Sequence, residues 1–247
     1  MKKLSKIVLL LYFCLGVFYF FKDTSQIYQP FLGISAKHWL GTNSYGRDIF
    51  ATLFAGNVYI FIMLGFGWLS FALAIFLGSA QGYLRGIYDF AIQRIYEVVI
   101  SIPFFFIIIL VGGWWELNIF SLGLLLLLIN WTFLLPYIRV QALSVSTASY
   151  IKQMQDIGYS PARILIAHIF PNVYHNTKHL LPFVLILFAT SLSALDFLGL
   201  SQAGAGSLIV EGVNYLNFPL ILLSSCGFLI VLLLSLLGIF NVSKYHD

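Results

Sequence analysis

Residues 150–172 read YIKQMQDIGYSPARILIAHIFPN, a polar stretch within a chain that is otherwise strongly apolar. Before the glycine of this stretch, apolar residues recur at helical spacing and predict one apolar stripe: Ile151, Met154 and Ile157. Gly158 follows directly, and glycine adopts a positive φ without steric penalty, as helix ends often require. The stretch therefore predicts a short helix that ends at a glycine hinge.

The second half of the stretch carries its own helix signals. Ser160 followed by Pro161 is typical of a helix start, because the hydroxyl caps a backbone N–H and proline fits the first helical position. Pro171 disfavours helix at the residue before it, so we expect the second helix to end near Phe170. Residues 148–172, called the elbow from here on, are thus predicted to form two short helices around a glycine.

The composition identifies the bilayer as the solvent of this chain. Of 247 residues, 60% are hydrophobic and only 9% are charged, whereas soluble domains carry about a quarter charged residues. Lys and Arg occur mostly singly, without the basic stripe that nucleic-acid binding requires. We therefore expect an all-α membrane protein in contact with lipid, with no nucleic-acid partner.

Motifs for catalysis or metal binding are absent from the sequence. Cys14 and Cys226 lie in apolar runs with no Cys or His at metal-ligand spacing, so neither a metal nor a cofactor is expected. There is no G-x-x-x-x-G-K-[ST] loop to bind ATP, and neither H-E-x-x-H nor G-x-S-x-G occurs. We expect the chain not to be an enzyme and not to power any transport by itself.

Apolar runs predict about six membrane-spanning helices, each of which needs about 20 apolar residues. The six segments lie at about residues 4–21, 58–80, 98–115, 117–140, 180–200 and 218–240. A cleaved signal peptide is the alternative interpretation of the first segment. Because Lys22-Asp23-Thr24 follows it without a small-x-small cleavage pattern, we expect an uncleaved helix.

The distribution of basic residues predicts the orientation of these spans, because cytoplasmic loops are rich in Lys and Arg. With a cytoplasmic N-terminus, only three of the 13 basic residues lie outside: Lys22, Lys37 and Arg47. The other ten lie inside: Lys2, Lys3, Lys6, Arg85, Arg94, Arg139, Lys152, Arg163, Lys178 and Lys244. This places both termini in the cytoplasm, and the elbow there between spans four and five.

Two interpretations of a cytoplasmic elbow remain open on the periodicity alone. It is either an amphipathic helix that lies on the lipid surface or a docking site for a soluble partner.

The elbow resembles the cytoplasmic coupling loop of ABC importer permeases, through Gly158 and the run His168-Ile169-Phe170-Pro171-Asn172. That family carries Glu-Ala-Ala at its start, where this chain has Lys152-Gln153-Met154, and a small apolar residue where this chain has Asp156. The resemblance implies contact with an ATPase subunit by eight residues: Lys152, Asp156, Gly158, Ser160, Arg163, His168, Pro171 and Asn172.

Three further segments resemble the dipeptide, oligopeptide and nickel branch of the same family. The first is residues 38–49, HWLGTNSYGRDI, in which Asn43 stands where the branch has Asp. It supplies an extracytoplasmic motif of Gly41, Thr42, Gly46, Arg47 and Asp48. The second comprises Gln81-Gly82-Tyr83, Asp89, Arg94 to Glu97 and Pro103, and the third is residues 194–200, ALDFLGL. Asp196 with Gln81 and Glu97 most resembles permeases for microcin C-type and related oligopeptides.

Physical roles can be assigned to several of these residues. Small residues four apart favour close helix packing, which we expect of Gly78, Gly82 and Gly86. Arg94 and Glu97, three residues apart, are expected to form a structural pair. An ionisable residue in a span is a functional candidate, so Asp196 is a candidate for the substrate path, where it would bind a peptide amino group at the outer water.

Arg47 and Asp48 have two interpretations. They form a local ion pair or cap a helix start, or else they contact the substrate or the protein that delivers it.

The resemblance implies a type I ABC importer permease fold in a bacterial inner membrane. We expect residues 1–53 to form the first span and an extracytoplasmic segment, 54–241 the transmembrane domain, and 242–247 a short cytoplasmic tail. The implied partners are a second permease subunit, two ATPase subunits that bind ATP and an extracytoplasmic solute-binding protein. The implied cargo is short peptides, with nickel or a metal chelate as the alternative.

Two other classes of function are less well supported by the sequence. A secondary transporter or channel would carry charged groups in mid-span regions or an inverted repeat, and neither is evident. An intramembrane enzyme would require a catalytic constellation, which is not found.

Overall fold

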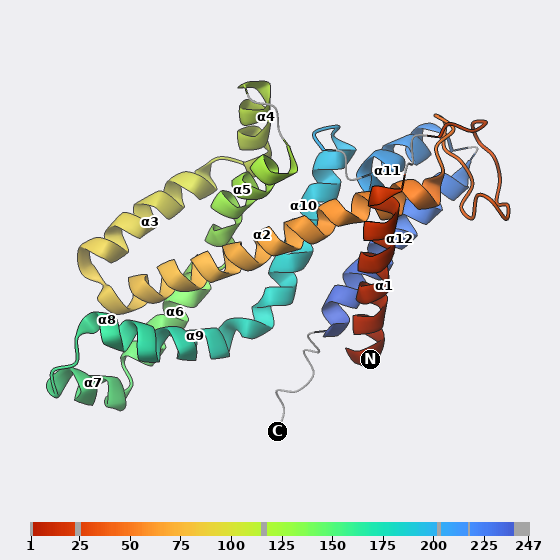
Figure 1. Cartoon of the computed structure of the whole chain (residues 1–247). Helices are drawn as coiled ribbons and strands as arrows, with labels where there is room; N and C mark the ends of the chain where they lie inside the picture. The colour runs from red at the N-terminus through yellow and green to blue at the C-terminus, as the bar shows by residue number, and fades with distance from the viewer. Residues whose placement is uncertain (1, 23–25, 115–117, 202–203, 217, 240–247) are drawn as a thin grey trace. The chain divides into compact units, whose positions relative to one another are not determined.

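A computed structural model describes residues 2–22, 26–114, 118–201, 204–216 and 218–239 (Figure 1). The regular elements in these residues are helical, which confirms the all-α prediction for them, and an isolated antiparallel bridge joins Thr42 to Asp48. The α-helices are α1 (Lys2–Phe21), α2 (Ile49–Leu84), α3 (Gly86–Ser101), α4 (Phe104–Trp114), α5 (Ile119–Asn130), α6 (Leu135–Ser146), α7 (Ser149–Asp156), α8 (Pro161–Ile164), α9 (Phe170–Thr177), α10 (Leu181–Phe197), α11 (Ala205–Asn214) and α12 (Pro219–Ile239). Shorter helical turns are η1 (Trp131–Phe133), η2 (Leu165–Ile169) and η3 (Lys178–Leu180).

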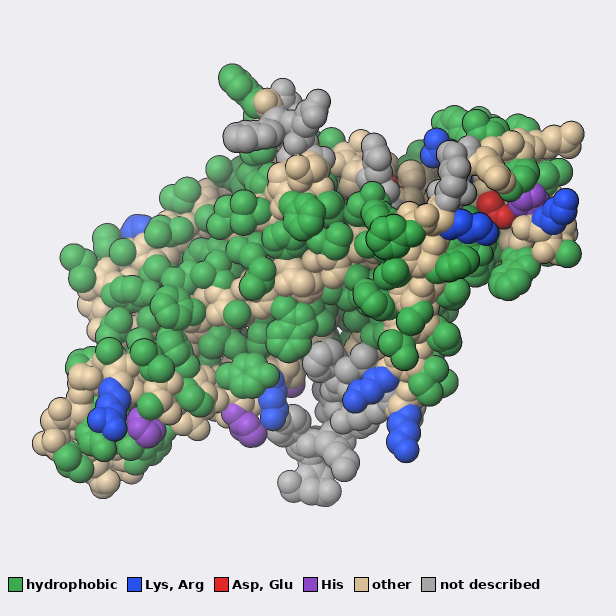
Figure 2. Space-filling model, in the orientation of Figure 1, with side chains coloured by type: hydrophobic (Ala, Val, Ile, Leu, Met, Phe, Trp, Pro, Cys, Tyr) green, Lys and Arg blue, Asp and Glu red, His purple; other side chains and the backbone are tan. Residues whose placement is uncertain are grey.

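Several of these helices are long and apolar enough to cross a membrane. Within the described residues there are four such stretches: Lys3–Phe21, Ile49–Leu84, Pro161–Phe197 and Pro219–Gly238. A fifth is added if Ile119–Phe133 and Leu135–Ser146, which are bent by 51°, count as one broken span. Hydrophobic side chains accordingly cover most of the face seen in Figure 2. The chain is a multi-pass membrane protein.

The difference from the six predicted spans lies at residues 98–115. This run is divided between α3 and α4, because Ile102 adopts an extended conformation (φ −106°, ψ 122°) before Pro103. The ring of a proline clashes with helical geometry at the preceding residue, and the apolar composition of the run hides this break. Residues 115–117, where the turn to the next span is predicted, lie outside the described part. So do residues 240–247, which include the end of the sixth predicted span and the tail with Lys244.

The chain divides into two compact units. The first unit comprises Met1–Gly65, Leu117–Ile119 and Leu185–Asp247, and the second Phe66–Glu116 and Phe120–Val184. The long helices α2 and α10 each contribute to both. The boundary expected near residue 53 stays a prediction.

Aromatic packing holds the first unit together around Tyr12 of α1. Its ring stacks on Phe228 of α12 at 4.9 Å between centroids and meets the edge of Phe54 of α2 at 5.4 Å. Asn57 of α2 donates a side-chain hydrogen bond of 2.8 Å to the carbonyl of Tyr12. The N-terminal helix is therefore packed against both α2 and α12.

Glycines bring α2 and α6 into close contact in the second unit. A Cβ added to Gly78 would lie 2.7 Å from Cγ2 of Ile138, and one added to Gly82 would lie 2.6 Å from Cβ of Ala142. Gly86 differs from the packing role that the four-residue spacing predicts. Nothing lies within 4 Å of its added Cβ, and its φ is +58°. Gly86 therefore serves the turn between α2 and α3.

We predict that Gly82→Ala lowers the free energy of unfolding by about 1–3 kcal/mol, the usual cost of overpacking a tight contact. The added methyl group would also lie 2.7 Å from the carbonyl oxygen of Arg139, so α2 and α6 would have to separate. Gly65→Ala is the matched control, because this glycine lies in the same helix and its added Cβ meets nothing within 4 Å. Thermal unfolding in detergent measures both variants, and equal melting temperatures would contradict the packing role.

Candidate functional site

The first arm of the elbow is α7, and its end is defined by backbone hydrogen bonds. The N–H of Tyr159 donates to the carbonyl of Met154, and the N–H of Gly158 donates to that of Gln155, both at 3.0 Å. This pair of bonds is the Schellman motif of helix C-termini, and it requires the left-handed conformation that Gly158 adopts at φ +91°. The hinge thus lies at the glycine where the sequence predicts it.

The second arm begins as expected and continues further than expected. Ser160 caps it, with its hydroxyl oxygen accepting the N–H of Arg163 at 3.4 Å. The predicted end near Phe170 is wrong, because a π-helical turn, η2, precedes Pro171. There the N–H of Phe170 bonds to the carbonyl of Leu165, five residues earlier. This wider turn accommodates the proline, so the helix runs on from Pro161 to Phe197.

Buried isoleucines and one asparagine hold the two arms together. Ile151, Ile164 and Ile169 are fully buried, and α6 packs against α7, η2 and α9. The side-chain amide of Asn172 donates to the carbonyl of His168 at 2.7 Å and to the hydroxyl of Tyr150 at 3.2 Å. The elbow is therefore a packed unit on α6, with the backbone carbonyl of His168 and the side chain of Asn172 serving its internal structure.

The outer surface of the elbow remains available. Ile157 is 76% exposed, beside exposed Tyr159, and Ile166 is exposed on the second arm. The guanidinium of Arg163 lies 4.8 Å from the ring centre of Tyr159. Other sequence-predicted residues are also exposed: Lys152, Asp156, Ser160 and Pro171. Figure 2 shows basic, His and hydrophobic side chains side by side over this region.

An ion pair supports the second unit next to the elbow. The guanidinium of Arg139 on α6 donates to both carboxylate oxygens of Asp89 on α3, at 2.9 and 2.7 Å. These hydrogen bonds lower the pKa of Asp89 below its usual value of 3.8. A lowered pKa means that the pair stabilises the fold above that value, and that this stabilisation is lost only as the pH falls through the still lower folded pKa.

Arg94 and Glu97 form the pair that their spacing predicts, at 2.6 Å on the exposed side of α3. An exposed pair of this kind contributes little to stability. Pro103 lies at the break that follows this helix.

The loop of residues 26–48 in the first unit is folded around the residues of the extracytoplasmic motif. Gly41 and Gly46 have φ of +76° and +71°, and an added Cβ would collide with the carbonyl oxygens of Leu32 and Tyr28. The hydroxyl of Thr42 donates to the carbonyl of Gln29 at 2.7 Å. These residues therefore determine the path of the loop.

Asp48 caps α2, which is one of the two roles that the sequence allows. One carboxylate oxygen accepts the N–H of Ala51 at 2.9 Å. The other lies 2.8 Å from Nδ1 of buried His38, a partner that sequence analysis missed. Arg47 is exposed, and no ion pair joins it to Asp48 among the described residues.

Comparison with known proteins now identifies the family. The model of the family described as "Binding-protein-dependent transport system inner membrane component" matches residues 73–243, more than half of the chain. The chain belongs to this family. The predicted resemblance to ABC importer permeases is thereby confirmed.

Relatives of this inner membrane component place it near peptide permeases. It is 32% identical to the inner membrane ABC transporter permease protein YejE of Escherichia coli K12, over 86% of this chain and 63% of the relative. It is 29% identical to the peptidoglycan transport system permease protein YejE of Agrobacterium fabrum, over 77% of this chain and 51% of the relative. It is 31% identical to the oligopeptide transport system permease protein OppC of E. coli K12, over 81% and 68%. The chain thus spans about half to two thirds of the length of these relatives.

Asn43 of the inner membrane component is the position at which the loop departs from the motif that it resembles. Its Oδ1 accepts the N–H groups of Tyr45 and Arg47, which orients Nδ2 toward Glu211 of α11 at 3.1 Å. The N–H of Ser44 donates to the other carboxylate oxygen of Glu211, which is only 8% exposed. The loop is therefore pinned to α11 through an amide that an aspartate could not replace. No sequence signal links residues 43 and 211.

Asp196 has a structural partner. It is 1% exposed, and its Oδ2 accepts the N–H of Ser207 in the first turn of α11 at 2.9 Å. The N-cap residue of that helix is Gly204, which has no side chain to offer. Access of Asp196 to outer water is therefore contradicted within this chain, because its carboxylate caps a neighbouring helix. A part in the substrate path stays a prediction.

We predict that Asn43→Asp lowers the free energy of unfolding of this inner membrane component by about 1–3 kcal/mol, since a donor to a buried carboxylate is replaced by a second acceptor. Adding Glu211→Gln should restore most of the loss, because the new amide donates across the same contact. Thermal unfolding of the single and double variants in detergent tests this. A loss that Glu211→Gln does not relieve would contradict the pairing.

Proposed function

We propose that this chain is a membrane-embedded permease subunit of an ATP-driven importer of short peptides. The observation that carries the proposal is the elbow, which is packed on α6 and has an exposed apolar tip. Its second arm is the beginning of the apolar helix Pro161–Phe197. The peptide class rests on the relatives named for oligopeptide and peptidoglycan transport. The relatives described above give no support to nickel as cargo.

The proposed assembly contains two permease subunits, two ATPase subunits that bind ATP, and an extracytoplasmic binding protein. Each elbow docks on an ATPase subunit from the cytoplasm. The positive-inside rule predicts that both chain termini lie on the same side of the membrane. The solvent-exposed Ile157 and Tyr159 support this, since exposed apolar side chains at the tip of a charged loop are typical of a contact surface. The alternative, a helix that lies on the lipid surface, does not require the left-handed turn at Gly158.

The structure suggests how movement at the elbow reaches the spans. Closure of the ATPase dimer displaces the tip, and α6 with α7, η2 and α9 moves as one packed group. Helical continuity from Pro161 to Phe197 then transmits this displacement along the chain. Nucleotide-dependent contacts at the tip thereby bias the equilibrium between inward-open and outward-open states.

We predict that Gly158→Val reduces peptide uptake at least about 10-fold, because a β-branched residue cannot adopt φ +91° and the hinge must rearrange. Gly158→Asn is the matched control, since asparagine tolerates the left-handed region, and uptake should stay within about 3-fold of the unmodified chain. The amount of purified chain separates loss of coupling from loss of folding. Normal uptake with Gly158→Val would overturn the role of the hinge.

We also predict that Ile157→Ser weakens retention of the ATPase subunits about 10-fold, since it removes an apolar contact without disturbing buried packing. Ile87→Ser is the control, because Ile87 is 87% exposed on α3, outside the elbow. Quantitative co-purification at several salt concentrations measures the affinity. If the two variants behave alike, the elbow tip is not the docking surface.

A further inference from the structure

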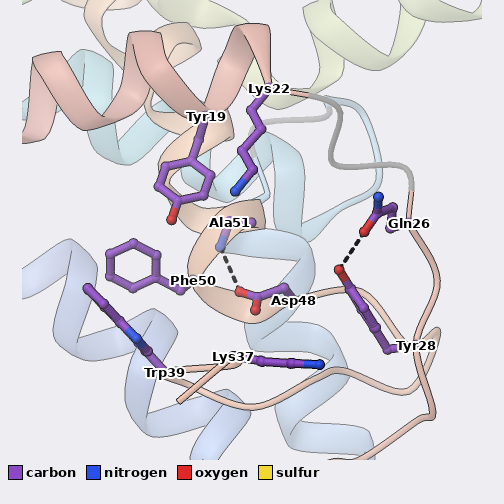
Figure 3. Close-up of a pocket in the computed structure, with 9 residues that line it drawn as sticks. All are labelled: Tyr19, Lys22, Gln26, Tyr28, Lys37, Trp39, Asp48, Phe50 and Ala51. Carbon is purple, nitrogen blue, oxygen red and sulfur yellow. Dashed lines mark hydrogen bonds between the residues drawn. The ribbon is translucent and has the colours of Figure 1, made fainter. Parts of the chain in front are cut away.

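A polar cavity of about 280 Å³ lies in the first unit where α1 ends and α2 begins. Its principal lining residues come from α1, the loop and α2, and they are Tyr19, Lys22, Lys37, Trp39, Asp48 and Phe50. In Figure 3, Lys22 reaches down from the end of α1 and Lys37 crosses the opposite side, with Asp48 between them. None of the permease roles described above uses this cavity.

The lining carries more positive than negative charge. Two ammonium groups face one carboxylate, which leaves an excess of one positive charge. The oxygens of that carboxylate already accept the N–H of Ala51 and face His38, so Asp48 is engaged elsewhere. Among the described residues, no carboxylate lies within 4 Å of either ammonium group. The cavity therefore suits a ligand with a single negative charge.

Hydrogen-bonding groups and aromatic rings complete the cavity. The hydroxyl of Tyr28 donates to Oε1 of Gln26 at 2.7 Å, so the amide nitrogen of Gln26 remains as a donor. Phe50 forms a wall with Trp39 and Tyr19, at 5.3 and 5.6 Å between ring centroids. One side of the cavity thus offers donors to an oxyanion, and the other offers an apolar surface.

The position of the cavity along α1 indicates the source of the anion. The apolar stretch of α1 ends at Phe21, so Lys22 lies at the level where a bilayer changes from hydrocarbon to headgroups. Trp39 lines the same cavity and is 64% exposed, and aromatic residues concentrate at this level. Lysines at the ends of spans extend toward lipid phosphates.

We propose that this cavity binds the headgroup phosphate of an anionic glycerophospholipid. The phosphodiester carries one negative charge, which matches the excess charge of the lining. Lys22 and Lys37 hold the phosphate from two sides, and the ring wall of Trp39 and Phe50 contacts the glycerol and the start of the acyl chains. The site ties the end of α1 and the loop to the membrane surface, and it does not depend on the proposed transport function.

The test uses the detergent-purified full chain with whatever subunits purify with it. Binding of short-chain phosphatidylglycerol is measured by native mass spectrometry for the unmodified chain and for the double variant Lys22→Gln with Lys37→Gln. We expect the double variant to bind about 30-fold more weakly, as befits the loss of two phosphate-facing lysines. The double variant Lys22→Arg with Lys37→Arg should keep affinity within about 3-fold, since it preserves the charges.

Arg47→Gln is the matched control for the loss of charge. Arg47 is exposed in the same loop but does not line the cavity, so phosphatidylglycerol binding should stay within about 2-fold. Equal weakening by Arg47→Gln and by the lysine variant would show only general attraction to a basic surface, and it would overturn the site. Unchanged binding by the lysine variant would overturn it as well.

Two further measurements distinguish the source of the anion. Short-chain phosphatidylcholine should bind at least about 10-fold more weakly than phosphatidylglycerol, and millimolar inorganic phosphate should not displace the lipid. Displacement by inorganic phosphate would assign the cavity to a free anion and contradict the lipid proposal. If the lysine variant lost affinity for an acidic extracytoplasmic protein while keeping its lipid, the cavity would be a protein contact, which also contradicts it.

Discussion

The close approach of α2 and α6 is the constraint on which the functional part of the second unit depends. Helices in a bilayer gain little from hydrophobic association and rely on close packing, which small residues allow. Gly78 and Gly82 let the backbone of α2 lie directly against Ile138, Arg139 and Ala142. Because α6 in turn packs against α7, η2 and α9, the position of the elbow depends on the two glycines of α2, Gly78 and Gly82.

Three carboxylates of the first unit hold backbone segments in position. Asp196 caps α11, Asp48 caps α2, and Glu211 receives the amide of Asn43 and the N–H of Ser44. An ionisable group buried near a membrane is costly unless hydrogen-bonded, so each observed contact offsets that cost. A carboxylate in or near an apolar helix is therefore weak evidence for a substrate site when a neighbouring helix start lies within reach.

Local signals predicted the features that depend on neighbouring residues. The hinge at Gly158, the cap at Ser160 and the pairing of Arg94 with Glu97 each involve residues within five positions. Features that join distant segments could not be predicted, because nothing in the order of residues links Asn43 to Glu211, Asp89 to Arg139 or Asp196 to Ser207. The apolar run at 98–115 was predicted to be one span because length and composition outweigh a single proline in a span count. Pro171 was predicted to end a helix, but a π-helical turn before it accommodates the proline.

That π-helical turn also sets the rotational phase between the elbow and the span that follows. A π turn holds one residue more than an α turn, and each residue advances an α-helix by about 100°. Residues before Leu165 and after Ile169 are therefore out of step, so the exposed face of α8 and the buried face of α9, with Val173 and Thr177, are oriented independently. Removing one residue of η2 would turn α8 relative to α9 by more than a quarter of a revolution about the helix axis.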